Sequence, residues 1–146
     1  MKKNQLEIIR DNIEEEPYVR YLGIKVVELK PGYSVVKMKA EHRFNNIFSI
    51  THGGAIFSLI DVAFGAAANS YGTIAVALSM SINYIEPAVE GDVLTASAIQ
   101  LAKTAKTATY SIKAKNSSDN IIAACQAVAY LKKQKLPFLG QNENYS

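Results

Sequence analysis

Apolar residues near the N-terminus recur first with helical spacing and then with strand spacing. In residues 4–15 they lie among charges in the pattern of a short amphipathic helix, which Pro17 interrupts. Residues 24–29 and 33–40 are expected to be a pair of strands, because apolar runs flank a Pro-Gly turn. Residues 41–51 are predicted to be a loop.

The next segment is apolar almost all round. His52, Gly53 and Gly54 precede residues 55–70, which are rich in Ala, Ile, Leu and Phe. The length of this segment and its alanine content predict a helix, and Gly72 is expected to end it. A helix without a polar face needs burial on most sides, so it should lie at the centre of the fold.

Beyond this helix the sequence predicts four strands. They are expected at 73–85, 92–101, 107–115 and 121–131. Four strands joined by short turns form an antiparallel sheet, and a curved sheet wrapped around the apolar helix would bury it. The expected fold class is therefore α+β, as one domain over residues 1–146 with a polar tail at 137–146.

Composition agrees with a single cytoplasmic domain. The chain has 146 residues, of which 49% are hydrophobic, and this is enough for one core. No apolar run reaches the roughly 20 residues that span a bilayer, so no membrane association is expected. The N-terminus lacks a secretory pattern, and we expect a cytoplasmic protein. The single cysteine, Cys125, excludes an internal disulfide and is expected to be an inert core thiol.

The charge of the chain is mild. Net charge is +3, and lysines gather in the second half. Lys103, Lys106, Lys132 and Lys133 would attract a phosphorylated ligand, although a solvated face explains each lysine equally well. No nucleic-acid motif accompanies them, so no nucleic-acid partner is expected. Two histidines and one cysteine at scattered positions predict no metal site, and the absence of a dinucleotide fingerprint predicts no bound cofactor.

One acidic residue is isolated in the sequence. Asp61 is the only formally charged residue between Arg43 and Glu86, and it lies inside the apolar helix. A carboxylate in such surroundings loses hydration, which raises its pKa and makes it costly unless it has a partner or a task. A functional carboxylate is the favoured interpretation. A side chain that caps a structure or points into water at the helix edge is the alternative.

The start of the same helix offers a second chemical group. The backbone N–H groups of Gly53 and Gly54 are free at a helix N-terminus, which suits a carbonyl oxygen that becomes an oxyanion. Gly53 and Asp61 are eight residues apart, or about 12 Å along one helix. If both act on one carbonyl, the sequence implies two antiparallel helices in a homodimer with shared sites.

The segment from Asn46 to Asp61 resembles a known signature. It has Asn six residues before His-Gly-Gly and Asp nine residues after the His, as in hotdog-fold thioesterases of the phenylacetic-acid-degradation (PaaI-like) type. Residues 22–24 and 84–88 are also similar to this family, and the resemblance covers residues 17–132. It implies a hotdog fold, with a curved sheet around one long helix, and hydrolysis of an aryl- or medium-chain acyl-CoA to free acid and CoA. It also supports a homodimer, which we expect to pair again into a homotetramer.

The resemblance implies roles for the matching positions. Asp61 matches the catalytic carboxylate, acting as nucleophile or as general base on water. Gly53 matches the residue whose backbone N–H polarises the thioester carbonyl, and Gly54 beside it is expected to contact substrate. Asn46 matches the residue that orients water or substrate. His52 matches the motif histidine, for which a positioning role is favoured over general base.

Other positions concern substrate contacts. Some relatives use Ser or Thr on the strand after the helix, where Ser79 and Ser81 are the candidates. Lys103 and Lys106 are candidates for contacts with CoA. The chain departs from many relatives at Ser49, where they carry glycine.

Two other functions stay open as alternatives. A hotdog enoyl-CoA hydratase or dehydratase uses a His with an acid in a motif of the Asp-x-Asn-x-x-His type, which this sequence lacks. A non-catalytic acyl-CoA binding module needs a pocket but has no need of Asp61, so the carboxylate argues against it.

Overall fold

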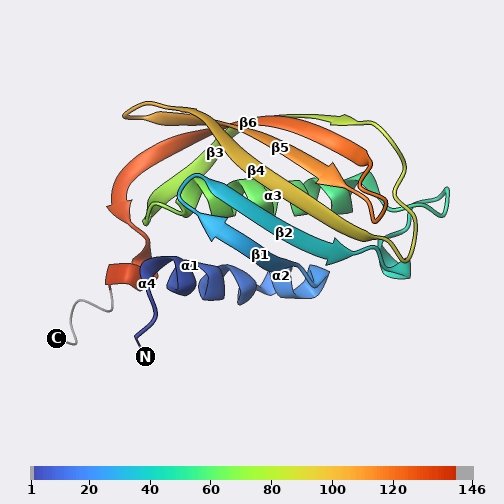
Figure 1. Cartoon of the computed structure of the whole chain (residues 1–146), viewed down its shortest axis with the longest axis horizontal. Coiled ribbons are helices and arrows are strands. Elements are labelled where there is room, and N and C mark those ends of the chain that lie inside the picture. The colour runs from blue at the N-terminus through green and yellow to red at the C-terminus, as the bar shows by residue number, and fades with distance from the viewer. Residues whose placement is uncertain (1, 141–146) are drawn as a thin grey trace.

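A curved six-stranded antiparallel sheet wraps around one long helix, α3 (Figure 1). The computed structural model describes residues 2–140. In chain order the elements are α1 (Gln5–Glu14), α2 (Pro17–Leu22), β1 (Lys25–Lys30), β2 (Tyr33–Lys39), the 3-10 turn η1 (His42–Phe44), α3 (Gly53–Asn69), β3 (Thr73–Tyr84), β4 (Val93–Lys103), β5 (Thr107–Lys115), β6 (Ile121–Lys135) and α4 (Pro137–Gly140). The predicted α+β class and all six predicted strands are confirmed.

The order of the strands in the sheet differs from their order along the chain. The sheet runs β1-β2-β4-β5-β6-β3, so β3 and β4 are consecutive in sequence but are not neighbours. β4 extends the sheet from β2, and β3 pairs with β6. The described chain therefore has β1 at one edge of the sheet and β3 at the other.

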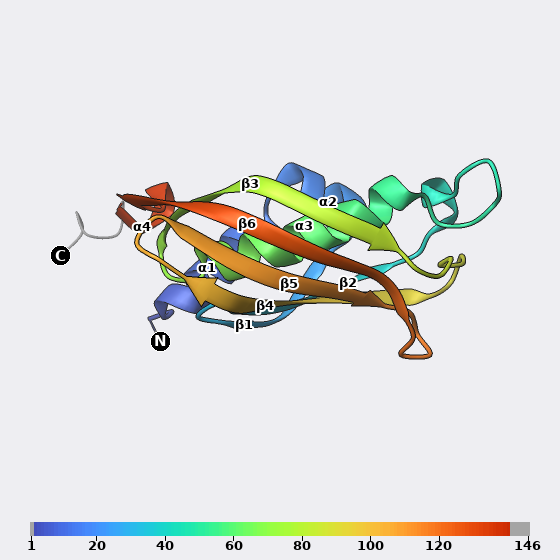
Figure 2. The same cartoon turned by 90° about the horizontal axis from the view of Figure 1, so that it is seen from above.

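The strands of the sheet run across α3 (Figure 2), and the inner face of the sheet carries small side chains. Leu59, Ile60 and Ala63 of α3 are 0% exposed. The strands present a set of alanines that are also 0% exposed: Ala96, Ala98, Ala114, Ala123, Ala127 and Ala129. Small side chains let a helix pack near the sheet without voids. The predicted buried central helix is confirmed, and its C-terminal cap is Ser70, with Gly72 in the following turn.

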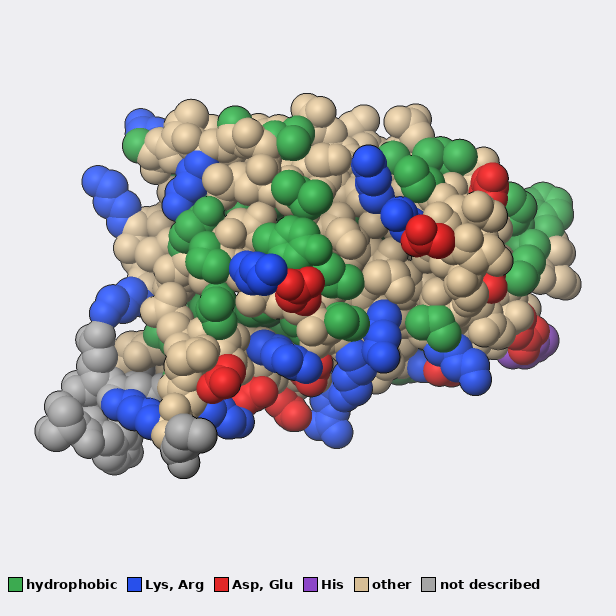
Figure 3. All heavy atoms as spheres, viewed as in Figure 1, with side chains coloured by type: hydrophobic (Ala, Val, Ile, Leu, Met, Phe, Trp, Pro, Cys, Tyr) green, Lys and Arg blue, Asp and Glu red, His purple; other side chains and the backbone are tan. Residues whose placement is uncertain are grey.

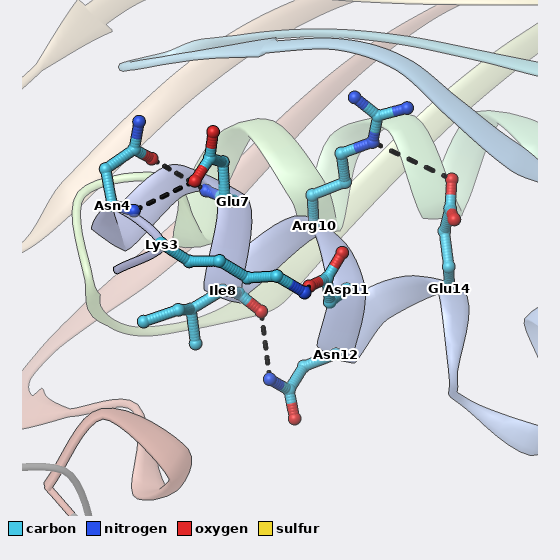
Figure 4. A network of polar contacts seen from close by, with 8 residues as sticks. All are labelled: Lys3, Asn4, Glu7, Ile8, Arg10, Asp11, Asn12 and Glu14. Carbon is cyan, nitrogen blue, oxygen red and sulfur yellow. Dashed lines mark hydrogen bonds and ion pairs between the residues drawn. The ribbon is translucent and has the colours of Figure 1, made fainter. Parts of the chain in front are cut away.

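The N-terminal helix begins with a capping box (Figure 4). The Asn4 side chain accepts a hydrogen bond from the Glu7 backbone N–H at 2.9 Å, and the Glu7 carboxylate accepts one from the Asn4 N–H at 3.0 Å. These bonds satisfy donors that a helix N-terminus otherwise leaves free. Lys3 also pairs with Asp11, which is eight residues further along the chain. The helix expected over residues 4–15 is confirmed as α1.

A second short helix, α2, was not predicted. Pro17 was expected to interrupt the first helix, and it does, but it also occupies the first turn of α2. Proline suits this position because its fixed φ is helical and its missing N–H has no helical partner there. Gly23, at a φ of 71°, ends α2. Val19 is 1% exposed, so α2 is packed onto the core.

The C-terminal segment turns back toward the end of α3. The Leu136 N–H donates a hydrogen bond to the Gly72 carbonyl oxygen at 2.9 Å, and residues 137–140 form α4 beside the N-terminal end of α1 (Figure 1). A polar, frayed tail was expected from residue 137. Its first four residues are helical, and residues 141–146 lie outside the described part.

Two further sequence predictions concern the core and the membrane. Cys125 in β6 is a free thiol that is 5% exposed, and burial raises its pKa, so the prediction of a core thiol is confirmed. Within residues 2–140, no helix is long and apolar enough to cross a membrane.

Candidate active site

Asp61 lies in a groove between the N-terminal helices, α3 and β3. The groove has a volume of about 670 Å³, and Asn12, Tyr18 and Val76 are among its lining residues. The Asp61 side chain keeps contact with solvent, but the walls of the groove remove part of its hydration, and this burial raises the pKa of its carboxyl. Within the described residues no donor or cation pairs with this carboxylate. The sequence-based expectation of an isolated, partly desolvated acid therefore holds.

A second carboxylate, that of Glu16, lines the same groove. Burial raises the pKa of the Glu16 carboxyl, and the negative charge of Asp61 raises it further. Glu16 was not among the predicted site residues, because Glu14, Glu15 and Glu16 form a run of acids that is normally a solvated surface. The signal was its position: Glu16 directly precedes the proline that starts α2, and the turn between the two helices places it in the wall of the groove, where it stays exposed to solvent.

The N-terminus of α3 forms a different depression, of about 300 Å³. Gly53 is the first residue of α3, and its N–H has no acceptor among the described residues. The Tyr84 hydroxyl donates a hydrogen bond to the Gly53 carbonyl oxygen at 3.1 Å. A Cβ on Gly53 would come within 3.3 Å of the Tyr84 ring. Tyr84 was part of the family resemblance but was not predicted as a site residue.

His52 fixes which glycine amide is available. Its Nδ1 accepts a hydrogen bond from the Gly54 N–H at 2.9 Å, so the His52 side chain is the N-cap of α3. Of the two glycine amides that sequence suggested, that of Gly54 is engaged and that of Gly53 is free. This contact agrees with a positioning role for His52.

Asn46 organises the loop that leads to α3. Its side-chain oxygen accepts hydrogen bonds from the N–H groups of Phe48 and Ile50 at 2.8 and 3.4 Å. The loop turns at Ser49, whose φ of 61° lies in the left-handed region, where glycine is favoured. Asn46 also lines the depression beside Gly53, and with its oxygen engaged, its side-chain amide nitrogen is the atom left for substrate or water.

These groups form two half-sites within one chain. Asn46, Gly53 and Tyr84 line one depression, whereas Asp61 lines the other. Eight residues of one helix separate Gly53 from Asp61, which corresponds to about 12 Å. A thioester carbonyl that contacts the Asp61 carboxylate of a chain is therefore out of reach of the Gly53 amide of the same chain.

A model of the thioesterase superfamily matches residues 48–123, which include all of α3. The E. coli acyl-coenzyme A thioesterase PaaI is 34% identical over 110 residues, or 75% of this chain and 79% of PaaI. The chain belongs to the thioesterase superfamily. A protein of Archaeoglobus fulgidus, provisionally named an esterase, is 36% identical over 138 residues, or 93% of this chain and 90% of its own.

Solved structures of thioesterase-superfamily proteins have the same fold. The E. coli PaaI structure superposes with a TM-score of 0.83 at 30% identity, covering 86% of this chain and 91% of that one. The predicted hotdog fold and PaaI-like membership are therefore confirmed. The relatives named as thioesterases act on acyl-coenzyme A, so the chemistry of the superfamily is thioester hydrolysis.

The remaining predicted site residues of this thioesterase-superfamily chain lie elsewhere. Ser79 and Ser81 pair with Val128 and Gln126 of β6, so their side chains share the outer face of the sheet, opposite α3 and Asp61. Their role in substrate binding stays a prediction that a single chain does not support.

The predicted CoA lysines are also distant from the glycine amide. The Lys103 ammonium lies 3.5 Å from the centroid of the Tyr71 ring, beyond the C-terminal end of α3, and Lys106 lies in the turn between β4 and β5. Neither lysine lines the groove of Asp61 or the depression of Gly53. Their contact with CoA stays a prediction.

Proposed function

We propose that this chain hydrolyses acyl-CoA thioesters and that Asp61 is the catalytic carboxylate. The observation that carries the proposal is the unpaired Asp61 carboxylate in an apolar groove, at the position of the family's catalytic acid. Water attacks the thioester carbonyl carbon while an Asp61 oxygen takes its proton, and the carbonyl oxygen becomes an oxyanion that accepts a hydrogen bond from the Gly53 N–H of a second chain. The C–S bond then breaks, and the proton on Asp61 passes to the departing CoA thiolate.

Asp61 can act in a second way with the same atoms. As a nucleophile its carboxylate would attack the carbonyl carbon, expel the CoA thiolate and form a mixed anhydride, which water then hydrolyses. Both routes need an ionised Asp61 that no cation neutralises. The lack of a partner for this carboxylate within residues 2–140 supports either route.

The complete site is proposed to come from two chains. β3 is a 12-residue edge strand, and its Val76 and Leu78 are 41% and 59% exposed. An exposed apolar edge strand is normally paired or covered. A second copy that pairs with β3 across a two-fold axis would bring its own α3 alongside Asp61.

The outer face of the sheet is the candidate surface for pairing dimers into a tetramer. Ile99 and Leu101 of β4 are 51% and 59% exposed, and Tyr130 of β6 is 40% exposed. Figure 3 shows apolar side chains grouped between lysines on the face of the molecule that is viewed there. Contact between two such faces would cover these apolar side chains.

Hydrolysis of octanoyl-CoA by the purified protein and by Asp61→Asn tests the proposed function. We expect wild-type protein to release CoA thiol and Asp61→Asn to lose the activity by orders of magnitude. Asp119→Asn is a matched control in the turn between β5 and β6, where the carboxylate pairs with Lys115 at 3.4 Å. Near-wild-type turnover by Asp61→Asn would refute the proposed role. Binding of octanoyl-CoA without hydrolysis would instead indicate a binding module.

A further inference from the structure

Three consecutive acids at the junction of α1 and α2 have different surroundings. The Glu14 carboxylate accepts a hydrogen bond from the Val26 N–H at 2.9 Å and lies 3.9 Å from Arg10 (Figure 4). The Glu15 carboxylate pairs with Arg20 at 3.3 Å. Glu16 is at the N-cap position of α2, yet its side chain makes no capping bond, and no described residue pairs with it. Glu16 alone of the three is unpaired and lines the groove.

Within one chain, the described lining of the groove therefore carries negative charge without a compensating cation. Its described lining includes the two carboxylates of Glu16 and Asp61 and no Lys, Arg or His side chain. The other polar side chains of the described lining are neutral: Asn12, Tyr18 and Asn69. The Tyr18 hydroxyl shares a hydrogen bond of 2.7 Å with that of Ser58, and the side-chain amides of Asn12 and Asn69 donate to the carbonyl oxygens of Ile8 and Gly65 at 2.9 and 2.8 Å. The rest of the lining is mostly apolar: Ile9, Ile13, Val19, Val62, Phe64, Ala75, Leu136 and Phe138.

We propose that Glu16 is a specificity-determining residue, which with Asp61 makes the groove accept neutral apolar acyl groups and reject acyl groups that carry a second carboxylate. The proposal rests on the proposed function, because it assigns the acyl group of the substrate to the groove beside Asp61. The substrate class is then an acyl-CoA with an uncharged hydrocarbon chain. Glu16 touches the acyl chain and takes no proton in the reaction.

The physical reason is repulsion in a partly desolvated space. A carboxylate on the acyl chain would enter a groove that holds two like charges and no cation, and it would lose hydration as it entered. Like charges at about 8 Å and an effective dielectric constant of about 20 repel strongly enough to change an equilibrium constant by on the order of tenfold or more. A neutral chain of the same length experiences neither effect.

The test compares two six-carbon substrates, hexanoyl-CoA and adipoyl-CoA, which differ by a terminal carboxylate. We expect wild-type protein to have a higher kcat/KM for hexanoyl-CoA than for adipoyl-CoA. Glu16→Gln should lower this hexanoyl-to-adipoyl ratio of kcat/KM by on the order of tenfold. The ratio is taken within each variant, so changes common to both substrates cancel. Glu15→Gln, which removes the neighbouring solvated charge, should keep the wild-type ratio.

Two further measurements separate charge from a purely structural effect. Glu16→Lys should lower the ratio more than Glu16→Gln does, and higher salt should lower the ratio in wild-type protein, because screening weakens the repulsion. Circular dichroism shows whether each variant is folded. If folded Glu16→Gln and Glu16→Lys kept the wild-type ratio, this inference would be overturned while the proposed hydrolysis stood. If wild-type protein hydrolysed no acyl-CoA, both the proposed function and the inference about Glu16 would be refuted.

Discussion

The aromatic side chain of Phe138 should set the length of acyl chain that the groove accepts. The groove runs along α3 from Asp61 to Asn69 and also includes Phe138 of α4. Eight helical residues span about 12 Å. An extended hydrocarbon with carbon–carbon bonds of about 1.5 Å advances by about 1.3 Å per carbon, so about nine carbons fit. We therefore expect wild-type protein to prefer octanoyl- or decanoyl-CoA.

Phe138→Ala should extend that preference. Removing the ring frees about 5 Å, which is room for about four more carbons. Each buried methylene contributes about 0.8 kcal/mol, so four give at most about 3 kcal/mol, or on the order of 100-fold. Since Phe138 is only half-buried, part of that space stays wet, and we expect about a tenfold rise in kcat/KM for tetradecanoyl-CoA relative to octanoyl-CoA.

The assay is release of CoA thiol from a series of saturated acyl-CoAs, at concentrations below micelle formation. Leu139→Ala is the matched control, because Leu139 is on the same short helix but lines a separate depression with Gln5 and Tyr71. It should keep the wild-type chain-length profile. An unchanged profile in Phe138→Ala, with a folded protein, would show that the acyl chain does not reach α4.

Other predictions concern stability, the glycine amide and pH. Ser49→Gly should raise the free energy of unfolding by about 0.5 kcal/mol in urea, because relief of left-handed strain outweighs the added freedom of the unfolded chain. Ser118→Gly is the control: its φ is negative, so the substitution should not stabilise the fold. Tyr84→Phe removes the bond to the Gly53 carbonyl and should lower kcat/KM by about 2- to 10-fold; unchanged kinetics would contradict a supporting role. The rate should fall at acid pH with a midpoint above the ordinary Asp pKa of 3.8, because burial raises the pKa of Asp61 and only the ionised carboxylate acts. Since the raised pKa makes the ionised form unfavourable in the folded state, Asp61→Asn should be more stable than wild type above that pKa, and the difference should vanish below pH 3.8.

Local sequence patterns were sufficient to predict most of the elements. The segment that became α3 has no polar face, so its burial followed from periodicity alone. Alternation and turn residues likewise located the six strands. Asp61 was found because no other formal charge lies near it in sequence, and the free amide of Gly53 followed from its place at a helix start.

Features that depend on distant contacts could not be predicted in this way. Nothing local shows that β4 would pair with β2 and leave β3 at an edge. In a sequence, Pro17 can interrupt one helix or begin the next. Here it does both, because the burial of Val19 holds the residues after it in a second helix, α2. Glu16 looked like part of a solvated acidic run, and only the fold of the turn between α1 and α2 separates it from Glu15.

Each site is proposed to take Asp61 from one chain and the Gly53 amide from another, and subunit mixing tests this arrangement most directly. Gly53→Pro removes the amide hydrogen, and the backbone suits proline at a first helical position after an extended residue such as His52, at φ −60° and ψ 137°. The new Cβ lies 3.3 Å from the Tyr84 ring, which is 53% exposed and has room to shift. Gly53→Pro and Asp61→Asn should each be inactive alone. After dissociation and reassembly together, half of the dimers are heterodimers with one intact site, so about a quarter of wild-type activity should return. Proven heterodimers without activity, or an active wild-type monomer, would contradict the shared site.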